Sequence, residues 1–121
     1  MDDVLAGRRI LVVEDDMLAL FMIEDMLADL GCDSVIVAAS IDQALALIDG
    51  QVFDAALLDV DLGGDDSHPV ADALAARKIP FAISTGYSEH HPRESGHDRP
   101  VLKKPFKSEE LAGILARVLS D

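Results

Sequence analysis

Short apolar runs alternate along the chain with longer segments whose apolar residues recur at three- and four-residue spacing. The short runs are typical of strands, and the longer segments are typical of helices with one buried face. In the first such segment the recurring residues are Leu20, Phe21, Ile23, Leu27 and Leu30. The predicted strands cover residues 8–13, 34–38, 53–59, 81–84 and 100–103, and the predicted helices cover 17–30, 40–48, a stretch from 67 and a stretch from 108. This alternation predicts right-handed βαβ units and an α/β fold built on one five-stranded parallel sheet.

The segment between the fourth and fifth predicted strands breaks the alternation. Residues 86–99 contain one proline and two glycines and show no apolar periodicity. Because glycine and proline interrupt regular structure, we expect the fourth helix of the pattern to be short or disordered. The segment also carries His90, His91 and His97, but no cysteine joins them and their spacing matches no closed zinc site.

Acidic residues follow two of the predicted strands at the point where each strand ends. Asp59 ends the third run, shortly before a glycine pair, and Glu14 and Asp15 follow the first run. Taken alone, Asp59 would be interpreted as a turn residue. Open α/β sheets, however, bind ligands at the carboxyl ends of their strands. Carboxylates gathered there repel one another unless a cation lies among them, so the pattern predicts an acidic pocket for Mg²⁺.

Two further strand ends carry polar groups, Thr85 after the fourth strand and Lys104 after the fifth. Each has an ordinary alternative, because a hydroxyl often stabilises a turn and a lysine at a strand end is usually solvated. Beside a metal-loaded carboxylate, a hydroxyl donor and an ammonium group complete a site for phosphoryl transfer to Asp59. Their joint appearance at the same edge of the sheet favours the site interpretation.

Composition narrows the function classes further. The formal net charge of −13 over 121 residues argues against nucleic acid as a partner. No apolar run approaches the roughly 18 residues of a spanning helix, so no membrane association is expected. The single Cys32 cannot form an internal disulfide, and the N-terminus is acidic where a secretory signal would be basic. We therefore expect one cytoplasmic domain over residues 1–121.

Four motifs together resemble the receiver domain of two-component response regulators. They stand in order along essentially the whole chain: Val12-Val13-Glu14-Asp15-Asp16, Leu57-Leu58-Asp59, Ser84-Thr85-Gly86 and Lys104-Pro105-Phe106. None of them is specific by itself, but the set is. The resemblance implies a doubly wound, flavodoxin-like sheet with the strand order 2-1-3-4-5 and a CheY-like phosphoacceptor signalling domain rather than an enzyme.

The resemblance also implies a role for each site residue. Asp59 would accept the phosphoryl group, Asp15 would bind Mg²⁺ directly, and Glu14 would bind it through water. The main-chain carbonyl of Asp61 would complete the metal ligands from the protein. The two polar groups at the ends of the fourth and fifth strands, Thr85 and Lys104, would hold the phosphoryl oxygens.

A finer resemblance is to the receiver subclass with the motif Pro-Phe-x-Phe-Ala-Thr-Gly-Tyr, which is associated with HWE-type sensor histidine kinases. This chain has Pro80-Phe81-Ala82-Ile83-Ser84-Thr85-Gly86-Tyr87, which departs from the motif at Ile83 and Ser84. Most receivers carry a switching Tyr or Phe three residues before the lysine, where this chain has Val101. We therefore expect Tyr87 to take over that role when phosphorylation orders the segment 86–99. The alternative is that Tyr87 only contacts a partner protein.

The implied partners are proteins. The phosphoryl donor would be a sensor histidine kinase, of the HWE type in the finer interpretation, or a phosphotransfer protein. With no output domain in the 121 residues, the chain is expected to be a stand-alone receiver. It would act on a protein target, which the sequence does not name, or drain phosphate from a kinase.

Two other functions fit parts of the pattern. A small Mg²⁺-dependent phosphohydrolase with an aspartate nucleophile could use Asp59-Val60-Asp61. In haloacid-dehalogenase-type phosphatases, however, an acidic pair lies downstream of the lysine, whereas Glu14 and Asp15 lie upstream here. A degenerate receiver would bind its partner without phosphorylation, but the complete set of site residues argues against it.

Overall fold

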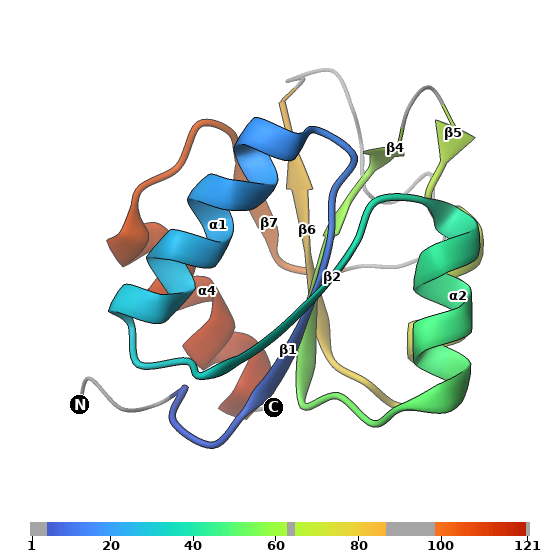
Figure 1. The fold of residues 1–121 in the computed structure, drawn as a ribbon, viewed down its shortest axis with the longest axis horizontal. Coiled ribbons are helices and arrows are strands. Elements are labelled where there is room, and N and C mark those ends of the chain that lie inside the picture. The colour runs from blue at the N-terminus through green and yellow to red at the C-terminus, as the bar shows by residue number, and fades with distance from the viewer. Residues whose placement is uncertain (1–4, 63–64, 87–98, 121) are drawn as a thin grey trace.

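The computed structural model describes residues 5–62, 65–86 and 99–120. At its centre lies a five-stranded sheet in the order β2-β1-β3-β6-β7, in which every neighbouring pair is parallel (Figure 1). The strands are β1 (Arg9–Val13), β2 (Ser34–Ala38), β3 (Ala55–Asp59), β6 (Phe81–Thr85) and β7 (Val101–Lys103). These are the five predicted strands in chain order. The predicted α/β class, the flavodoxin-like fold and the strand order 2-1-3-4-5 are therefore confirmed.

The middle of the sheet is buried on both faces. Every residue of β3 and β6 is buried, as is every residue of β1 after Arg9. A strand covered on both faces has no polar side to display, which explains why these segments appear in the sequence as nearly continuous apolar runs. The register pairs Val13 with Leu58 and Leu58 with Ile83, so these three strands end at nearly the same level.

Two pairs of helices cover the faces of the sheet within the described residues. Helices α1 (Met17–Asp29) and α4 (Ser108–Ser120) lie on one face, and α2 (Ile41–Gly50) and α3 (His68–Ala76) lie on the other (Figure 1). Helix α1 buries Leu20, Ile23 and Leu27, but Phe21 points away from the core and is exposed. Among the described residues, no helix has both the length and the apolar character needed to cross a membrane.

The helix ends follow local hydrogen-bonding rules. Helix α2 begins as predicted, with the Ser40 hydroxyl accepting from the Gln43 N–H at 3.1 Å. The side chain of Gln43 reaches back to the Ala39 N–H, one residue before the cap. Helix α3 begins after Ser67 as predicted, but Ser67 makes no side-chain capping hydrogen bond, and Pro69 stands in the first turn. Proline fits there because the first turn leaves its N–H groups without helical partners.

Helices α1 and α3 end in the same type of turn with different residues. After α1, Gly31 has a φ of 90°, and the Cys32 N–H donates to the Leu27 carbonyl at 3.0 Å. After α3, Lys78 has a φ of 59°, and the Ile79 N–H donates to the Leu74 carbonyl at 2.9 Å. Both are Schellman turns, which need a left-handed residue and therefore favour glycine. Lys78 adopts this conformation with a side chain attached.

Beyond β3 the chain forms a small hairpin that the sequence did not predict. The two-residue strands β4 (Asp61–Leu62) and β5 (Asp65–Asp66) pair antiparallel. Strands of this length are too short to show apolar alternation, so the sequence pattern indicated a loop. The predicted short fourth helix lies mostly in 87–98, outside the described residues, together with Tyr87 and the three neighbouring histidines.

The amino end of the sheet is closed by paired polar groups. The Arg9 N–H donates to Oδ2 of Asp54 at 2.7 Å, and the Asp54 N–H donates to the Arg9 carbonyl at 2.8 Å. The Arg9 guanidinium donates to Gln51 Oε1 and lies over the Phe53 ring, 5.3 Å from its centroid. Arg8 places a second positive charge 3.9 Å from the Asp54 carboxylate. These contacts extend the pairing of β1 with β3 beyond the ends of the strands.

Candidate functional site

The four strands β1, β3, β6 and β7 bring predicted site residues to the carboxyl edge of the sheet. Glu14 follows β1, Asp59 ends β3, Thr85 ends β6 and Lys104 follows β7. The register pairs Asp59 with Ser84 and Thr85 with Lys103, so the chain reaches this edge at matching heights. The parallel topology therefore brings together residues that are far apart in sequence.

Three carboxylates form a compact acidic cluster at this edge. Glu14, Asp15 and Asp59 each offer an oxygen, and the three oxygens lie within 4.8 Å of one another. Glu14 and Asp59 are buried, whereas Asp15 is exposed and leaves the cluster open to solvent. An all-oxygen set of this kind suits a hard divalent cation such as Mg²⁺. The structure thus places the three predicted acidic side chains where one ion could contact them all.

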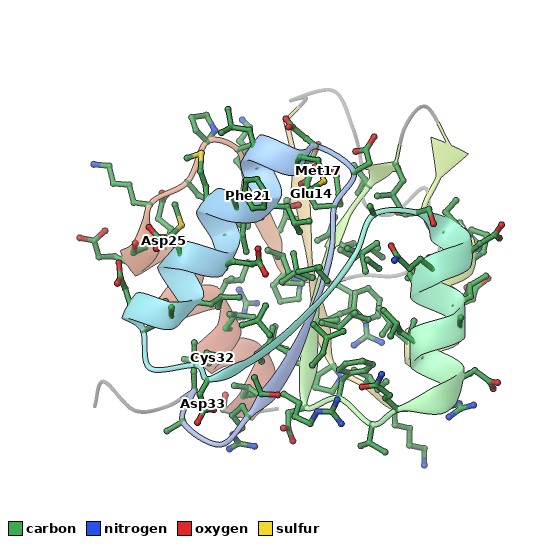
Figure 2. All side chains as sticks on the ribbon, in the orientation of Figure 1. Glu14, Met17, Phe21, Asp25, Cys32 and Asp33 are labelled. Carbon is green, nitrogen blue, oxygen red and sulfur yellow. The ribbon has the colours of Figure 1, made fainter. Side chains whose placement is uncertain are left out.

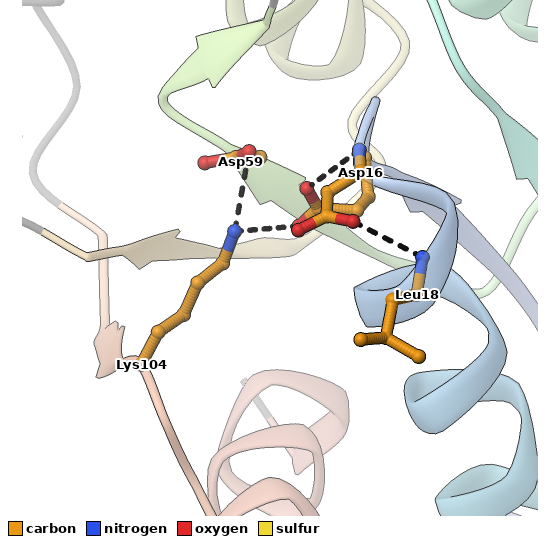
Figure 3. Close-up of polar contacts among 5 residues, drawn as sticks. Asp16, Leu18, Asp59 and Lys104 are labelled. Carbon is orange, nitrogen blue, oxygen red and sulfur yellow. Dashed lines mark hydrogen bonds and ion pairs between the residues drawn. The ribbon is translucent and has the colours of Figure 1, made fainter.

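Lys104 is the cation that contacts this cluster in the described structure (Figure 3). Its Nζ lies 2.7 Å from Oε1 of Glu14 and 3.3 Å from Oδ2 of Asp59. Burial alone would lower the pKa of Lys104, but the hydrogen bond to Glu14 and the negative charges of Asp59 and Glu14 outweigh burial and raise the pKa above its ordinary value. Lys104 therefore carries a full positive charge between two buried carboxylates.

Thr85 and Asp61 complete the set of predicted residues at this edge. Thr85 is buried, and its carbonyl accepts a hydrogen bond from the Lys104 N–H at 2.8 Å. That bond ties the end of β6 to the residue that carries the ammonium group. Asp61 is the first residue of β4, two positions beyond Asp59, and its backbone is described while its side chain is not. The metal-binding role of its main-chain carbonyl stays a prediction.

The sequence pattern of the response regulator receiver domain family matches residues 10–116 of the chain. The chain belongs to this family. The matched range contains all of the predicted site residues, Glu14, Asp15, Asp59, Asp61, Thr85 and Lys104. The receiver interpretation is therefore confirmed, and it is favoured over the phosphohydrolase alternative.

Three relatives illustrate the similarity. The sensor protein TorS of Escherichia coli K12 is 31% identical over 121 residues, which include 95% of this chain but only 13% of TorS. A second relative is the receiver domain of the sensor histidine kinase PA1611 from Pseudomonas aeruginosa PAO1, which was crystallised with a magnesium ion in its active-site cleft. It is 32% identical to this chain with a TM-score of 0.85, and the match covers 96% of this chain and 100% of the PA1611 domain. SdrG from Sphingomonas melonis Fr1 is 44% identical with a TM-score of 0.80, covering 96% and 98%. These matches establish the domain type and leave the finer HWE-associated subclass a prediction.

Sequence reasoning missed one residue of this receiver site. Asp16 is the N-cap of α1, and its Oδ1 accepts a hydrogen bond from the Leu18 N–H at 3.0 Å (Figure 3). The Asp16 N–H in turn donates to Oε2 of Glu14 at 3.2 Å. The first of these contacts could have been anticipated, because Asp directly before a helix is a common cap. The second depends on how the Glu14 side chain folds back.

An exposed apolar surface on α1 adjoins the site. Met17, Leu18, Phe21 and Met22 expose between 49% and 68% of their surface, and Met17 and Phe21 lie one turn apart on the helix (Figure 2). Beside them, a groove of about 380 Å³ is lined by α1 and by the segment after β7, including Phe106, and it reaches Lys104 and Gly86. Exposed large apolar side chains grouped on one helix are typical of a surface that contacts another protein.

Val101 stands where most receivers carry a switching aromatic residue. It is 44% exposed on the edge strand β7 and pairs with Ile83. A valine there offers no ring that could move between exposed and buried positions. Tyr87, the predicted replacement, lies outside the described residues, so its role stays a prediction.

Proposed function

We propose that Asp59 of this receiver accepts a phosphoryl group from a phosphohistidine in a Mg²⁺-dependent reaction. The observation that supports this most directly is the surroundings of Asp59. Its buried carboxylate lies 3.3 Å from the Lys104 ammonium and within 4.8 Å of the carboxylate oxygens of Glu14 and Asp15. A turn aspartate would need only backbone donors, whereas the Lys104 ammonium and a cation held by the clustered carboxylates would stabilise the negative charge that accumulates during phosphoryl transfer.

The proposed reaction is a displacement at phosphorus. An Asp59 carboxylate oxygen forms a bond to phosphorus while the bond from phosphorus to the imidazole nitrogen breaks and leaves its electron pair on that nitrogen. Negative charge spreads over the three equatorial phosphoryl oxygens and needs positive partners and donors. Lys104 is already adjacent to Asp59, and Thr85 would offer its hydroxyl from the end of the neighbouring strand. Later attack by water on the aspartyl phosphate would return Asp59 to its free form, so the domain turns over only its own phosphoryl group.

We also propose Mg²⁺ as the cofactor. When bound, the ion neutralises charge on the phosphoryl oxygens. Asp15 and Asp59 would be direct ligands, and the main-chain carbonyl of Asp61 would be a third. Glu14 would act through water, since both of its oxygens already accept protein hydrogen bonds. The magnesium ion in the related PA1611 receiver domain supports this assignment.

The phosphoryl donor is proposed to be a protein, a sensor histidine kinase or a phosphotransfer protein. A small phosphate donor would need only the acidic pocket, whereas the exposed apolar surface of α1 and the groove beside it favour a protein that covers them. The sequence from Pro80 to Tyr87 resembles the HWE-associated motif and supports a kinase of that type. A meeting with this donor in the cytoplasm stays part of the proposal.

Mass spectrometry after incubation with Mg²⁺ and acetyl phosphate tests the acceptor. The wild type should gain one phosphoryl adduct that is stable in acid and labile in alkali, and Asp59→Asn should gain none. Asp54→Asn is the matched control, because it changes the carboxylate at the other end of β3 and should leave the adduct intact. Lys104→Ala should still accept some phosphoryl but transmit little to a target. A full adduct on Asp59→Asn would contradict the proposal, and turnover of p-nitrophenyl phosphate would support a phosphohydrolase.

A comparison of phosphorylation by a kinase and by acetyl phosphate tests whether the donor is a protein that docks on α1. Phe21→Ala and Met22→Ala should slow phosphorylation by a cognate kinase without changing phosphorylation by acetyl phosphate. Val52→Ala is the matched control, because Val52 is a similarly exposed apolar residue at the amino end of the sheet. A panel of HWE-type and other kinases would then test the subclass. Equal kinase rates for Phe21→Ala, Met22→Ala and Val52→Ala would contradict docking on α1.

A further inference from the structure

Asp16 connects the start of α1 to the side chain of Glu14 in this receiver. Its side chain caps α1 through the Leu18 N–H, and its carbonyl accepts the first helical hydrogen bond, from the Leu20 N–H at 2.9 Å. Its own N–H points the other way and donates to Oε2 of Glu14. Because the cap holds Asp16 on the rigid end of a helix, the N–H has a defined direction.

Glu14 is held by two donors, one on each oxygen (Figure 3). Oε2 accepts from the Asp16 N–H at 3.2 Å, and Oε1 accepts from Lys104 Nζ at 2.7 Å. The Glu14 side chain is only 2% exposed, so water cannot replace either donor freely. Loss of one donor would let the carboxylate turn about its last side-chain bond.

The orientation of Glu14 affects where the Lys104 ammonium lies. Nζ is closer to Glu14, at 2.7 Å, than to Asp59, at 3.3 Å. A Glu14 carboxylate that turned away would release Lys104 toward Asp59, where its charge would compete with a cation for the same oxygens. The position of Glu14 therefore influences how much negative charge Asp59 presents to Mg²⁺.

We infer that Asp16 is a positioning residue of the site, because its main-chain N–H holds Glu14 in the orientation that keeps Lys104 partly off Asp59. This inference rests on the proposed Mg²⁺-dependent function. Partners that orient a metal site from outside the ligand set typically change metal affinity 10- to 100-fold, and a single N–H at 3.2 Å belongs at the lower end. We expect loss of this N–H to weaken Mg²⁺ binding about tenfold.

A proline substitution removes the N–H. Asp16 has a φ of −83°, close to the range of a proline ring, so Asp16→Pro keeps this φ while it removes the donor to Glu14. Asp16→Ala is the matched control, because it loses the same capping carboxylate but keeps the N–H. In Mg²⁺ titrations by calorimetry, Asp16→Pro should bind about tenfold more weakly than the wild type, and Asp16→Ala within about twofold of it. Equal affinities of the two variants would overturn the inference.

The same two substitutions made in the Glu14→Ala variant show whether Asp16 changes Mg²⁺ affinity through Glu14 or directly through Asp15. If Asp16 acts through Glu14, then Asp16→Pro and Asp16→Ala should bind Mg²⁺ equally when each is combined with Glu14→Ala. A difference that persists there would mean that proline disturbs Asp15, which would overturn the inference. If the wild type itself binds no Mg²⁺, the proposed function fails instead.

Nuclear magnetic resonance of the metal-free protein provides a readout that is independent of Mg²⁺. The Asp16 amide proton should shift upfield in Glu14→Ala, because it loses its acceptor. It should remain nearly in place in Leu11→Val, a conservative change inside β1 that leaves Glu14 intact. An Asp16 amide signal that does not respond to Glu14→Ala would contradict the hydrogen bond on which the inference depends.

Discussion

Strand β3 has an aspartate at each end, and the two carboxylates have opposite surroundings. Asp54, just before the strand, accepts from the Arg9 N–H at 2.7 Å and lies 3.9 Å from the Arg8 guanidinium. Asp59 is the last residue of the strand, and its carboxylate lies within 4.8 Å of carboxylate oxygens of Glu14 and Asp15. The Nζ of Lys104 lies 3.3 Å from Oδ2 of Asp59. Negative charge is matched at the amino end of the sheet and exceeds positive charge at the carboxyl end.

This difference separates the end of the sheet that contributes to stability from the end at which we propose the reaction. Paired charges at the amino end connect β1 and β3 and contribute to stability. At the carboxyl end Glu14 and Asp59 share the Lys104 ammonium, and we expect the three clustered carboxylates to repel one another and lower stability until a cation binds. The buried centre of β3 lies between the two ends and holds Asp59 in place. The same residue type therefore has opposite effects on the free energy of folding at positions 54 and 59.

The largest effect on stability is expected from Asp54→Ala. The partly buried N–H of Arg9 loses its acceptor, so the free energy of unfolding should fall by about 2 kcal/mol. Urea denaturation followed by circular dichroism measures this change. The increase in melting temperature on adding Mg²⁺ should match that of the wild type. A loss of the Mg²⁺ response would show that the two ends of the strand are not independent.

Asp59→Asn should change stability in the other direction. Removing one of the three clustered charges should raise the free energy of unfolding by about 1 kcal/mol in the absence of Mg²⁺, because like charges a few ångströms apart repel one another by about this much. Asp15→Asn should also be stabilising. In both variants the stabilisation by Mg²⁺ should shrink or vanish, because the ligand binds the folded state less well. If Asp59→Asn is less stable than the wild type, attraction to Lys104 outweighs the repulsion and the contrast between the two ends is wrong.

Lys78 tests whether the amino end is free of strain. At a φ of 59° its side chain is in the left-handed region, which costs non-glycine residues about 1–2 kcal/mol. Lys78→Gly removes that cost but makes the unfolded chain more flexible, so we expect a net gain of about 0.5 kcal/mol by chemical denaturation. Gly31→Ala, at the equivalent turn after α1, should be destabilising. A destabilised Lys78→Gly would mean that the lysine side chain makes contacts that compensate for its backbone.

The smallest effect on stability is expected from ionisation of the Cys32 thiol at high pH. Burial, with a smaller contribution from Asp33, raises the pKa of this thiol despite a hydrogen bond to Ser34. The folded state therefore disfavours the thiolate, and stability is retained below the ordinary thiol pKa of 9.0 and lost as the pH rises toward the folded-state pKa. Unfolding free energies measured from pH 8 to pH 10 should decrease less steeply for Cys32→Ala than for the wild type. Equal slopes would show that the thiol ionises as readily in the folded protein as in the unfolded chain.

The sequence by itself predicted the sheet, its strand order through the family resemblance, and the edge at which the site lies. These features depend on local signals, since apolar runs such as Ala55–Asp59 mark buried strands and the residue after each run marks its carboxyl end. The hairpin from Asp61 to Asp66 was missed because two-residue strands show no periodicity. The predicted site residues do converge, but the role of each of them, and of Tyr87, stays a prediction.

Only the tertiary structure decided which side chains these residues contact. Lys104 contacts Glu14, 90 positions away, more closely than Asp59, 45 positions away, and no local pattern encodes that preference. Helical periodicity grouped Phe21 with Leu20 and Ile23. The sheet and α4 cover Leu20 and Ile23, whereas Phe21 remains 58% exposed. Spacing along a chain indicates which residues share a face, whereas burial and ion pairing depend on what the rest of the fold brings against that face.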